Sequence, residues 1–301
     1  AARAGVLAGD EIAEINGIST KGLSVEEAAK HIKGPKGTQV ELTLLTKGIR
    51  RKLKMMRDEI QISSVQTAKM LDDKVGYIRL STFISQKANT EMQKALTKLS
   101  SAKGLVLDLR DNPGGLLTNA VEISNMFLSG QTPIVSTVDK DGYKSPSWSD
   151  GKPISQQHLV VLINRGSASA SEIASGALKD NGRALLVGSK TFGKGLVQGI
   201  HRLEDGSGIN YTIARYLTPN DVDIHNKGIF PDIAVELTEQ DHAEGRGPWW
   251  LDPSGTAAIR KPEDLKDLQL KRAVETLKER IQSPVVVGNA AGQTASQSTQ
   301  Q

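Results

Sequence analysis

A lysine between two glycines is the first residue in this chain whose setting suggests chemistry. Residues 188–194 read Gly-Ser-Lys-Thr-Phe-Gly-Lys and follow an apolar stretch, which matches the G-x-x-x-x-G-K pattern of a phosphate-binding loop. Such a loop also needs Ser or Thr after the lysine, and then a helix. Gly195 stands at that position, and residues 196–203 alternate like a strand. The motif therefore lacks two features of a phosphate-binding loop. A P-loop nucleotide binder is only an alternative interpretation of this segment.

Lys194 has a second chemical interpretation, as a general base. An ammonium group accepts no proton near neutral pH unless burial or a neighbouring positive charge favours the neutral amine. Phe192 and Leu196 flank Lys194 and its glycines, and we expect this strand to lie in the interior. The sequence therefore predicts a desolvated amine.

A serine-rich junction upstream supplies a candidate nucleophile. The apolar segment 159–163 leads into Asn-Arg-Gly-Ser-Ala-Ser-Ala-Ser-Glu-Ile at 164–173, and a helix follows. A serine at a strand-to-helix turn can present its hydroxyl while the next backbone amide points at the same place. Ser169 and Glu172 also form an S-x-x-E capping box, a device that stabilises a helix by about 1 kcal/mol. The pattern alone favours the cap.

A glycine pair follows a second apolar strand. Residues 105–110 lead into Asp-Asn-Pro-Gly-Gly at 111–115. Adjacent glycines let backbone amides approach a ligand closely, and open α/β sheets place their sites at the carboxyl ends of strands. An ordinary strand-to-helix turn would explain the same residues, so the pattern leaves both interpretations open.

Other chemistries find no support in the sequence. The histidines lack the paired spacing of metal ligands; they are His31, His158, His201, His225 and His242. No G-x-S-x-G elbow surrounds a serine, and the absence of cysteine excludes disulfides and thiolate sites. The chain has 38 basic and 34 acidic residues, a net charge of +4, which is too small an excess to predict a nucleic-acid partner. We expect no metal and no cofactor.

The elements that must position these residues fall into four parts. Residues 1–57 hold short strands and one helix, and residues 58–245 alternate strands and helices, which predicts an α/β core with a largely parallel sheet and a mixed edge. Residues 246–287 include an amphipathic helix that begins at Lys261 and packs on the core, and residues 288–301 form a low-complexity tail predicted to be disordered. No apolar run is long enough to span a membrane.

Taken in order, these phrases resemble the carboxyl-terminal processing peptidases, also called tail-specific proteases, and within them the cyanobacterial and chloroplast branch. The phrase at 4–12 resembles the back half of a bacterial PDZ domain, whose front half does not precede it. The other phrases lie at 107–115, 166–173, 191–195 with Gln198, and 228–232. Each is modest alone, but together they are specific. Since the chain begins at Ala1 without methionine, we expect a fragment that lacks its targeting segment.

The resemblance implies a serine endopeptidase that cuts proteins near their carboxyl terminus. Family spacing places the nucleophile 25 residues before the base, which selects Ser169 to pair with Lys194. Gln198 matches the position that holds the lysine. The backbone amides of Gly115 and Ala170 match the oxyanion hole.

The resemblance also implies a setting and partners. Such enzymes are exported, to the periplasm, the thylakoid lumen or the outer face of the inner membrane, and need neither metal nor nucleotide. Their PDZ domain admits proteins with flexible carboxyl-terminal tails, and one member of this branch trims a photosystem II reaction-centre precursor. Peripheral membrane association is a further expectation.

Two acidic residues match positions where the family has a characteristic residue. Asp180 matches an acid that we interpret as structural, and Asp221 stands where relatives usually carry glycine. The main alternative to the peptidase is a catalytically inactive PDZ-type protein that captures carboxyl termini without cutting them. The intact set of site residues argues against that alternative.

Overall fold

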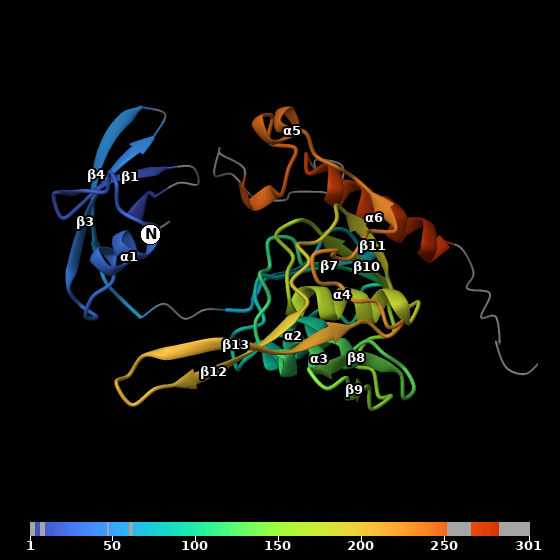
Figure 1. Ribbon diagram of the computed structural model, residues 1–301. Coiled ribbons are helices and arrows are strands. Elements are labelled where there is room, and N and C mark those ends of the chain that lie inside the picture. Colours follow the sequence, from blue (N-terminus) through green and yellow to red (C-terminus); the bar gives the residue numbers. More distant parts are fainter. Residues whose placement is uncertain (1–3, 7–9, 47, 60–62, 252–265, 283–301) are drawn as a thin grey trace, which may run out of the picture.

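The computed structural model describes residues 4–6, 10–46, 48–59, 63–251 and 266–282 (Figure 1). The predicted tail at 288–301 and the predicted start of the last helix at Lys261 lie outside these residues.

A four-stranded antiparallel sheet and one helix make up the amino-terminal unit. The sheet has the order β2-β1-β3-β4, with strands at Glu11–Ile15 (β1), Ile18–Ser19 (β2), Gln39–Thr46 (β3) and Ile49–Met56 (β4). Helix α1 (Val25–Ile32) begins at a capping box, in which the Glu27 carboxylate accepts the Ser24 N–H at 2.8 Å. The buried core of this unit consists of Ile15, Val40, Leu42 and Leu44.

A six-stranded sheet forms the centre of the second unit. Its order is β14-β11-β10-β7-β6-β5, and all neighbours are parallel except β5 and β6. The strands are Val65–Met70 (β5), Val75–Leu80 (β6), Gly104–Asp108 (β7), His158–Ile163 (β10), Leu185–Gly188 (β11) and Ile233–Ala234 (β14). The predicted α/β core with a largely parallel sheet is thereby confirmed.

Helices cover both faces of this sheet, which explains why its central strands are apolar without interruption. One face packs against α2 (Ala88–Lys98), α3 (Leu117–Asn125) and α4 (Ala170–Asp180), and the other against α6 (Leu268–Gln282). In β7, Leu105 and Leu107 pack on the first face and Val106 on the second. Gly104 lets α6 approach closely, because a Cβ there would lie 2.8 Å from Leu277 Cδ1.

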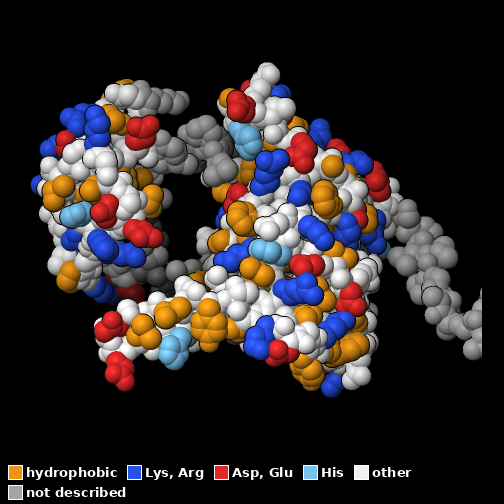
Figure 2. Space-filling model, in the orientation of Figure 1, with side chains coloured by type: hydrophobic (Ala, Val, Ile, Leu, Met, Phe, Trp, Pro, Cys, Tyr) orange, Lys and Arg blue, Asp and Glu red, His pale blue; other side chains and the backbone are white. Residues whose placement is uncertain are grey.

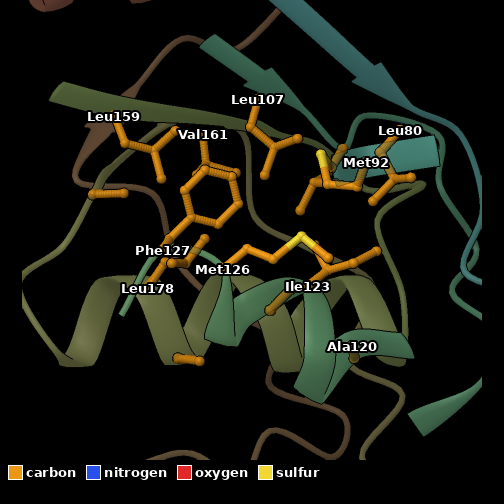
Figure 3. Close-up of a cluster of buried hydrophobic side chains, with 14 of the residues drawn as sticks. Leu80, Met92, Leu107, Ala120, Ile123, Met126, Phe127, Leu159, Val161 and Leu178 are labelled. Carbon is orange, nitrogen blue, oxygen red and sulfur yellow. The ribbon is translucent and has the colours of Figure 1, made fainter. Parts of the chain in front are cut away.

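The larger core lies between the sheet and the first group of helices. Figure 3 shows Leu107 and Val161 from the sheet pointing toward Ile123 and Phe127, with Leu178 of α4 beside them. Each of these side chains is at most 1% exposed. Burial of such side chains, at about 25 cal/mol per Å², is the main force that holds the layers together. It also fixes the carboxyl ends of β7 and β10, where the candidate site begins.

A second, separate sheet is antiparallel and has the order β12-β13-β8-β9. Its strands are Pro133–Asp139 (β8), Lys144–Trp148 (β9), Leu196–Arg202 (β12) and Gly208–Leu217 (β13). The sequence predicted the β-rich stretches 195–203 and 208–217 as a mixed edge of the main sheet, and this detail is wrong. β13 pairs with β8 instead, Leu217 opposite Ser136. The β12–β13 hairpin projects from the core (Figure 1), and Figure 2 shows exposed hydrophobic side chains along it.

A fully buried ion cluster joins the end of β7 to the start of α6. The Arg110 guanidinium binds Asp108 at 2.6 Å and Asp267 at 2.8 Å, with all three side chains at most 1% exposed. Burial alone would lower the pKa of Arg110, but the two carboxylates raise that pKa well above its usual value. The Tyr77 hydroxyl donates to Asp108 at 2.9 Å, and the Trp249 indole donates to the Tyr77 hydroxyl at 2.8 Å. The cluster thus anchors the residue that immediately precedes the glycine-pair loop.

The remaining helices are short. Helix α5 spans Glu239–Ala243, and a 3₁₀ turn (η2) spans Trp249–Leu251. Among the described helices, none has the length and apolar character needed to cross a bilayer.

Candidate active site

Ser169 lies at the strand-to-helix junction that the sequence singled out. β10 ends at Ile163, and α4 begins at Ala170, one residue after the serine. Ser169 has φ 55° and ψ −115°, a conformation that costs a non-glycine residue about 1–3 kcal/mol and is concentrated at functional sites. The half-buried serine therefore sits on a sharp, strained turn of the kind that presents nucleophiles.

The two serines on either side of Ser169 have structural hydrogen bonds. The fully buried Ser167 hydroxyl donates to the Leu109 carbonyl at 2.8 Å and accepts the Asn164 N–H at 3.0 Å. The Ser171 hydroxyl, also fully buried, donates to the Asn112 carbonyl at 2.8 Å. Solvent reaches only the middle serine of the three. This observation singles out Ser169 without reference to any relative.

Glu172 connects the junction between β10 and α4 (residues 164–169, the serine turn) to the segment between β11 and β12 (residues 189–195, the lysine loop). This side chain is fully buried, and one of its oxygens accepts the backbone N–H of Ser169 at 2.9 Å and of Lys194 at 2.8 Å. The other oxygen accepts the Thr191 hydroxyl at 2.6 Å and the Gly193 N–H at 2.7 Å. Sequence reasoning identified Glu172 only as a helix cap and missed this second role. The S-x-x-E pattern located the residue, but nothing local could reveal the other loop.

The environment of Lys194 differs from the buried one that the sequence predicted. The residue is exposed, and its ammonium group has no hydrogen bond or ion pair with any residue that the structure describes. The expectation of a desolvated amine on an interior strand is wrong. Lys194 lies two residues before the edge strand β12. Its neighbour Gly195 packs against backbone, since a Cβ there would lie 2.6 Å from His225 N.

Gln198 lies on β12, opposite Thr212, just after a register shift between Val197 and Gln198. Its side chain is exposed, and no hydrogen bond joins it to Lys194. The structure thus places Gln198 on the same short segment as the lysine without a contact between their side chains. Its assigned role of holding the lysine remains a prediction.

The glycine-pair loop presses directly against the serine turn. A Cβ on Gly114 would lie 2.9 Å from Ser169 Cβ and 2.8 Å from Ala170 N. The Asn112 side chain fixes this loop by accepting the Gly114 N–H at 2.9 Å and donating to the Leu80 carbonyl at 2.8 Å. Only glycine fits here, because φ of Gly114 is 96°.

The predicted oxyanion donors are available in this arrangement. Gly115 forms a parallel bridge with Phe83 and has φ 151°. Ala170 is the first residue of α4, so its N–H has no partner within the helix and lies at the positive end of the helix dipole. Neither amide has a hydrogen-bond acceptor among the described residues. Two free donors therefore accompany the exposed hydroxyl of a strained serine.

The acid at position 180 makes hydrogen bonds within the fold, in agreement with its interpretation as a structural residue. The Asp180 carboxylate accepts the Thr218 hydroxyl at 2.6 Å and the Asn220 N–H at 3.0 Å. Asp221 in the same loop has φ 60°, the left-handed conformation that glycine adopts without strain. Its carboxylate pairs with Lys144. The loop keeps the backbone form of a glycine turn despite the substitution.

The phosphate-loop and metal alternatives receive no structural support. The segment after β11 continues into strand β12 rather than a helix, so it lacks the helix terminus that receives a phosphate. The five histidines lie on separate elements or loops, and the described part of the chain brings no three His, Asp or Glu side chains together as a metal site.

Comparison with known families assigns this arrangement. A model described as peptidase family S41 matches residues 74–235, and a PDZ domain model matches residues 1–46. The chain belongs to peptidase family S41. The matched S41 segment contains the serine turn, the glycine-pair loop and the lysine loop. The PDZ match includes β1, β2, α1 and β3.

Named relatives of this S41 chain are carboxyl-terminal processing enzymes. It is 45% identical over 257 residues to a carboxyl-terminal-processing protease of Synechocystis sp., covering 82% of this chain and 59% of the relative. It is 40% identical over 248 residues to carboxyl-terminal-processing peptidase 3, chloroplastic, of Arabidopsis thaliana, covering 77% and 47%. The chain therefore spans about half the length of the curated relatives that it matches.

A solved structure agrees with the fold. A photosystem II D1 C-terminal processing protease has a TM-score of 0.60 and 38% sequence identity, covering 78% of this chain and 65% of that one. The predicted resemblance to the carboxyl-terminal processing peptidases, in their cyanobacterial and chloroplast branch, is thus confirmed. The same comparisons support a serine peptidase and give no support to the nucleotide-binding or non-catalytic alternatives.

Proposed function

We propose that this chain is the peptidase part of a carboxyl-terminal processing serine endopeptidase that uses Ser169 as nucleophile and Lys194 as general base. The observation that carries the proposal is the Glu172 carboxylate, which accepts the backbone N–H groups of both residues at 2.9 and 2.8 Å. It holds the strained serine turn and the lysine loop in one unit. The free amides of Gly115 and Ala170 complete an acyl-transfer site.

The chemistry follows from these positions. Ser169 Oγ attacks the scissile carbonyl carbon while its proton passes to Lys194 Nζ, and the carbonyl oxygen becomes an oxyanion that the amides of Gly115 and Ala170 stabilise. The carbon–nitrogen bond then breaks, and Lys194 returns the proton to the leaving amine. Water hydrolyses the resulting ester with Lys194 as base again, which releases a carboxylate product and restores the Ser169 hydroxyl.

Because Lys194 is exposed, we infer that the bound substrate must also shield its amine from water. Exclusion of water favours the neutral, proton-accepting form of an amine. A polypeptide lying across Ser169 also covers Lys194 and excludes water from it. We therefore infer that substrate binding completes the base, and that Gln198 orients the amine in that covered state.

The proposed substrates are proteins with flexible carboxyl-terminal tails, which the amino-terminal unit presents to the site. One relative is named for processing photosystem II D1, and a precursor of that kind is included in the proposal. An extracytoplasmic location and peripheral membrane association are parts of the same proposal. Fractionation of cells that express the full-length protein tests both.

The decisive experiment compares wild type, Ser169→Ala and Lys194→Arg on a carrier protein with an unstructured carboxyl-terminal tail. Mass spectrometry of the products should show tail cleavage by wild type alone, unaffected by a chelator. Lys194→Arg keeps the positive charge but removes the proton acceptor, so it separates base catalysis from simple electrostatic attraction. Binding of the carrier without cleavage by any of the three proteins would favour the tail-capturing alternative.

A further inference from the structure

Two of the four phenylalanines in this chain lie exposed beside the lysine loop. Phe83 and Phe127 are at most 1% exposed, whereas Phe192 is 67% and Phe230 is 60% exposed. A single exposed apolar side chain needs no explanation, but grouped ones mark an interaction surface. Phe192 lies two residues before Lys194, so this surface adjoins the candidate base.

Backbone pairing brings the two phenylalanines onto neighbouring segments. The Thr191 N–H donates to the Ile229 carbonyl at 3.1 Å, and the Asn226 N–H donates to the Gly193 carbonyl at 2.9 Å. The lysine loop therefore runs antiparallel to the segment that ends in Phe230. These hydrogen bonds fix both backbones before any ligand binds.

One side chain of the lysine loop points inward and its neighbours are open to solvent. The Thr191 hydroxyl points inward and donates to the buried Glu172 carboxylate at 2.6 Å. Phe192, the next residue, is 67% exposed, and Lys190 on the other side of Thr191 is half-buried. Lys194 follows two residues after Phe192 and is also exposed. Phe192 and Lys194 are therefore both open to solvent, and Lys190 is partly so.

Positive charge accompanies the aromatic rings. The Lys190 amine lies 5.1 Å from the centre of the Phe230 ring, within the range of a cation–π contact. Lys227, on the paired segment, is exposed. None of Lys190, Lys194 and Lys227 forms an ion pair with a residue in the described ranges. The face therefore offers two apolar rings and unpaired cations.

The chemistry of the dyad sets which part of a substrate meets this face. Lys194 gives its proton to the leaving amine, so residues beside Lys194 meet the segment downstream of the scissile bond. We propose that Phe192 and Phe230 form an aromatic shelf that binds an apolar side chain of this downstream segment, while Lys190 binds a carboxylate in it. The inference rests on the proposed function and adds the chemistry of the preferred tail.

Synthetic peptides that share one sequence up to the mapped cleavage site test the shelf. Their downstream segments differ in one feature at a time: Leu or Gly at the second residue, Asp or Asn at the third, and a free or amidated carboxyl terminus. Wild type should cleave the Leu peptide with a kcat/KM about tenfold above the Gly peptide. The Asp/Asn and acid/amide pairs show which carboxylate Lys190 binds.

Variants then assign the preference to residues. Phe192→Ala and Phe230→Ala should bring the Leu/Gly ratio close to 1, chiefly by raising KM for the Leu peptide, and Phe192→Leu should restore much of the ratio. Lys190→Gln should keep the Leu/Gly ratio but abolish the preference for the carboxylate peptides, which is strongest at low salt. Trp148→Ala removes an aromatic residue that is 56% exposed on β9, and it should change neither ratio.

The outcomes separate the shelf from the proposed function. Cleavage that survives in Ser169→Ala, or no cleavage of any peptide by wild type, would overturn the proposed function and the shelf together. Ser169-dependent cleavage with equal rates on the Leu and Gly peptides would overturn the shelf alone. An equal loss on both peptides in Phe192→Ala would also overturn it, because it indicates a structural role.

Discussion

The carboxylate of Glu172 lies 2.8 Å from the backbone nitrogen of Lys194, although 22 residues separate them in the chain. The same carboxylate accepts three further hydrogen bonds, from Ser169 N, Thr191 Oγ1 and Gly193 N. These donors replace the hydrogen bonds to water that the carboxylate loses on burial. Glu172 therefore makes the position of the lysine loop depend directly on the position of the serine turn.

Removal of the Glu172 charge should uncouple the two loops. In Glu172→Gln, an NH₂ group replaces one of the two accepting oxygens. This group cannot accept a hydrogen bond, so it faces backbone N–H donors that lose their acceptor. We expect about 2–4 kcal/mol of lost unfolding free energy and a fall in kcat of about 10²-fold, the cost of misplacing catalytic groups by about 1 Å. Urea titration and steady-state kinetics measure the two effects.

Glu27→Gln provides the matched control for that variant. Glu27 closes the same S-x-x-E box on Ser24 at the start of α1, but it is exposed and makes no contact with the candidate site. Its loss should cost at most about 1 kcal/mol and leave kcat unchanged. A comparable fall in kcat for both variants would contradict the coupling role of Glu172.

The three serines of the junction should separate into one catalytic and two structural residues. Ser169→Ala should lower kcat by more than about 10³-fold with an unfolding free energy within about 1 kcal/mol of wild type. Ser167→Ala leaves the Asn164 N–H without its acceptor and the Leu109 carbonyl with only the Asn112 N–H. It should cost about 1–3 kcal/mol with a loss of activity below tenfold. Cleavage by Ser169→Ala together with none by Ser167→Ala would move the nucleophile to Ser167.

A methyl group on Gly114 should damage both folding and catalysis. Its Cβ would lie 2.6 Å from the Ala168 carbonyl oxygen and 2.9 Å from Ser169 Cβ, and its φ of 96° disfavours any side chain. We expect Gly114→Ala to lose about 2–4 kcal/mol and most activity. Gly142→Ala shares a positive φ but meets no atom within 4 Å, so it should cost about 1 kcal/mol and leave kcat unchanged.

The buried cluster around Arg110 should be sensitive to the loss of one partner. Asp267→Asn leaves the guanidinium with one carboxylate in a dry environment, and we expect a loss of about 3–5 kcal/mol, measured by urea titration. The exposed pair of Lys140 and Asp141 is the control, since Lys140→Ala should change stability by less than about 1 kcal/mol. Equal effects of the two substitutions would show that Arg110 does not depend on Asp267.

The contact between α6 and the turn before β6 should weaken in acid. Burial alone would raise the pKa of Asp72, but the Lys278 ammonium at 2.8 Å and the N–H groups of Lys74 and Val75 hold that pKa below its usual value. A carboxyl with a lowered folded pKa stabilises the fold above its unfolded pKa of about 3.9, and this stabilisation is lost as pH falls through the folded pKa.

The measurement is the free energy of unfolding at several pH values. The difference between wild type and Asp72→Asn should be about 1 kcal/mol or less at pH 7 and should shrink as the pH falls toward 3. Asp73→Asn changes the neighbouring, exposed carboxyl and should follow the wild-type profile throughout. A difference for Asp72→Asn that does not change with pH would contradict the ion pair.

Local sequence determined most elements of the core. The apolar strands at 104–108 and 158–163 and the helix after Ser169 lie where the sequence predicted them, because each depends on side-chain pattern and capping within a few residues. The β-rich stretches were also located correctly. The pairing of β13 with β8 was not predicted, since strand pairing depends on residues far apart in the chain.

The candidate site shows the same division. The sequence alone was sufficient to identify the motif residues and their order, and these indicated the family. The residues are Gly115, Ser169, Lys194 and Gln198. The sequence did not predict that Lys194 is exposed or that Glu172 binds the lysine loop. Both features depend on contacts between loops that meet only in the folded chain. Sequence by itself determined which groups are present and which segments carry them. Tertiary structure alone decided which groups are buried and which are joined, because burial and hydrogen bonding depend on distances in space rather than on separation along the chain.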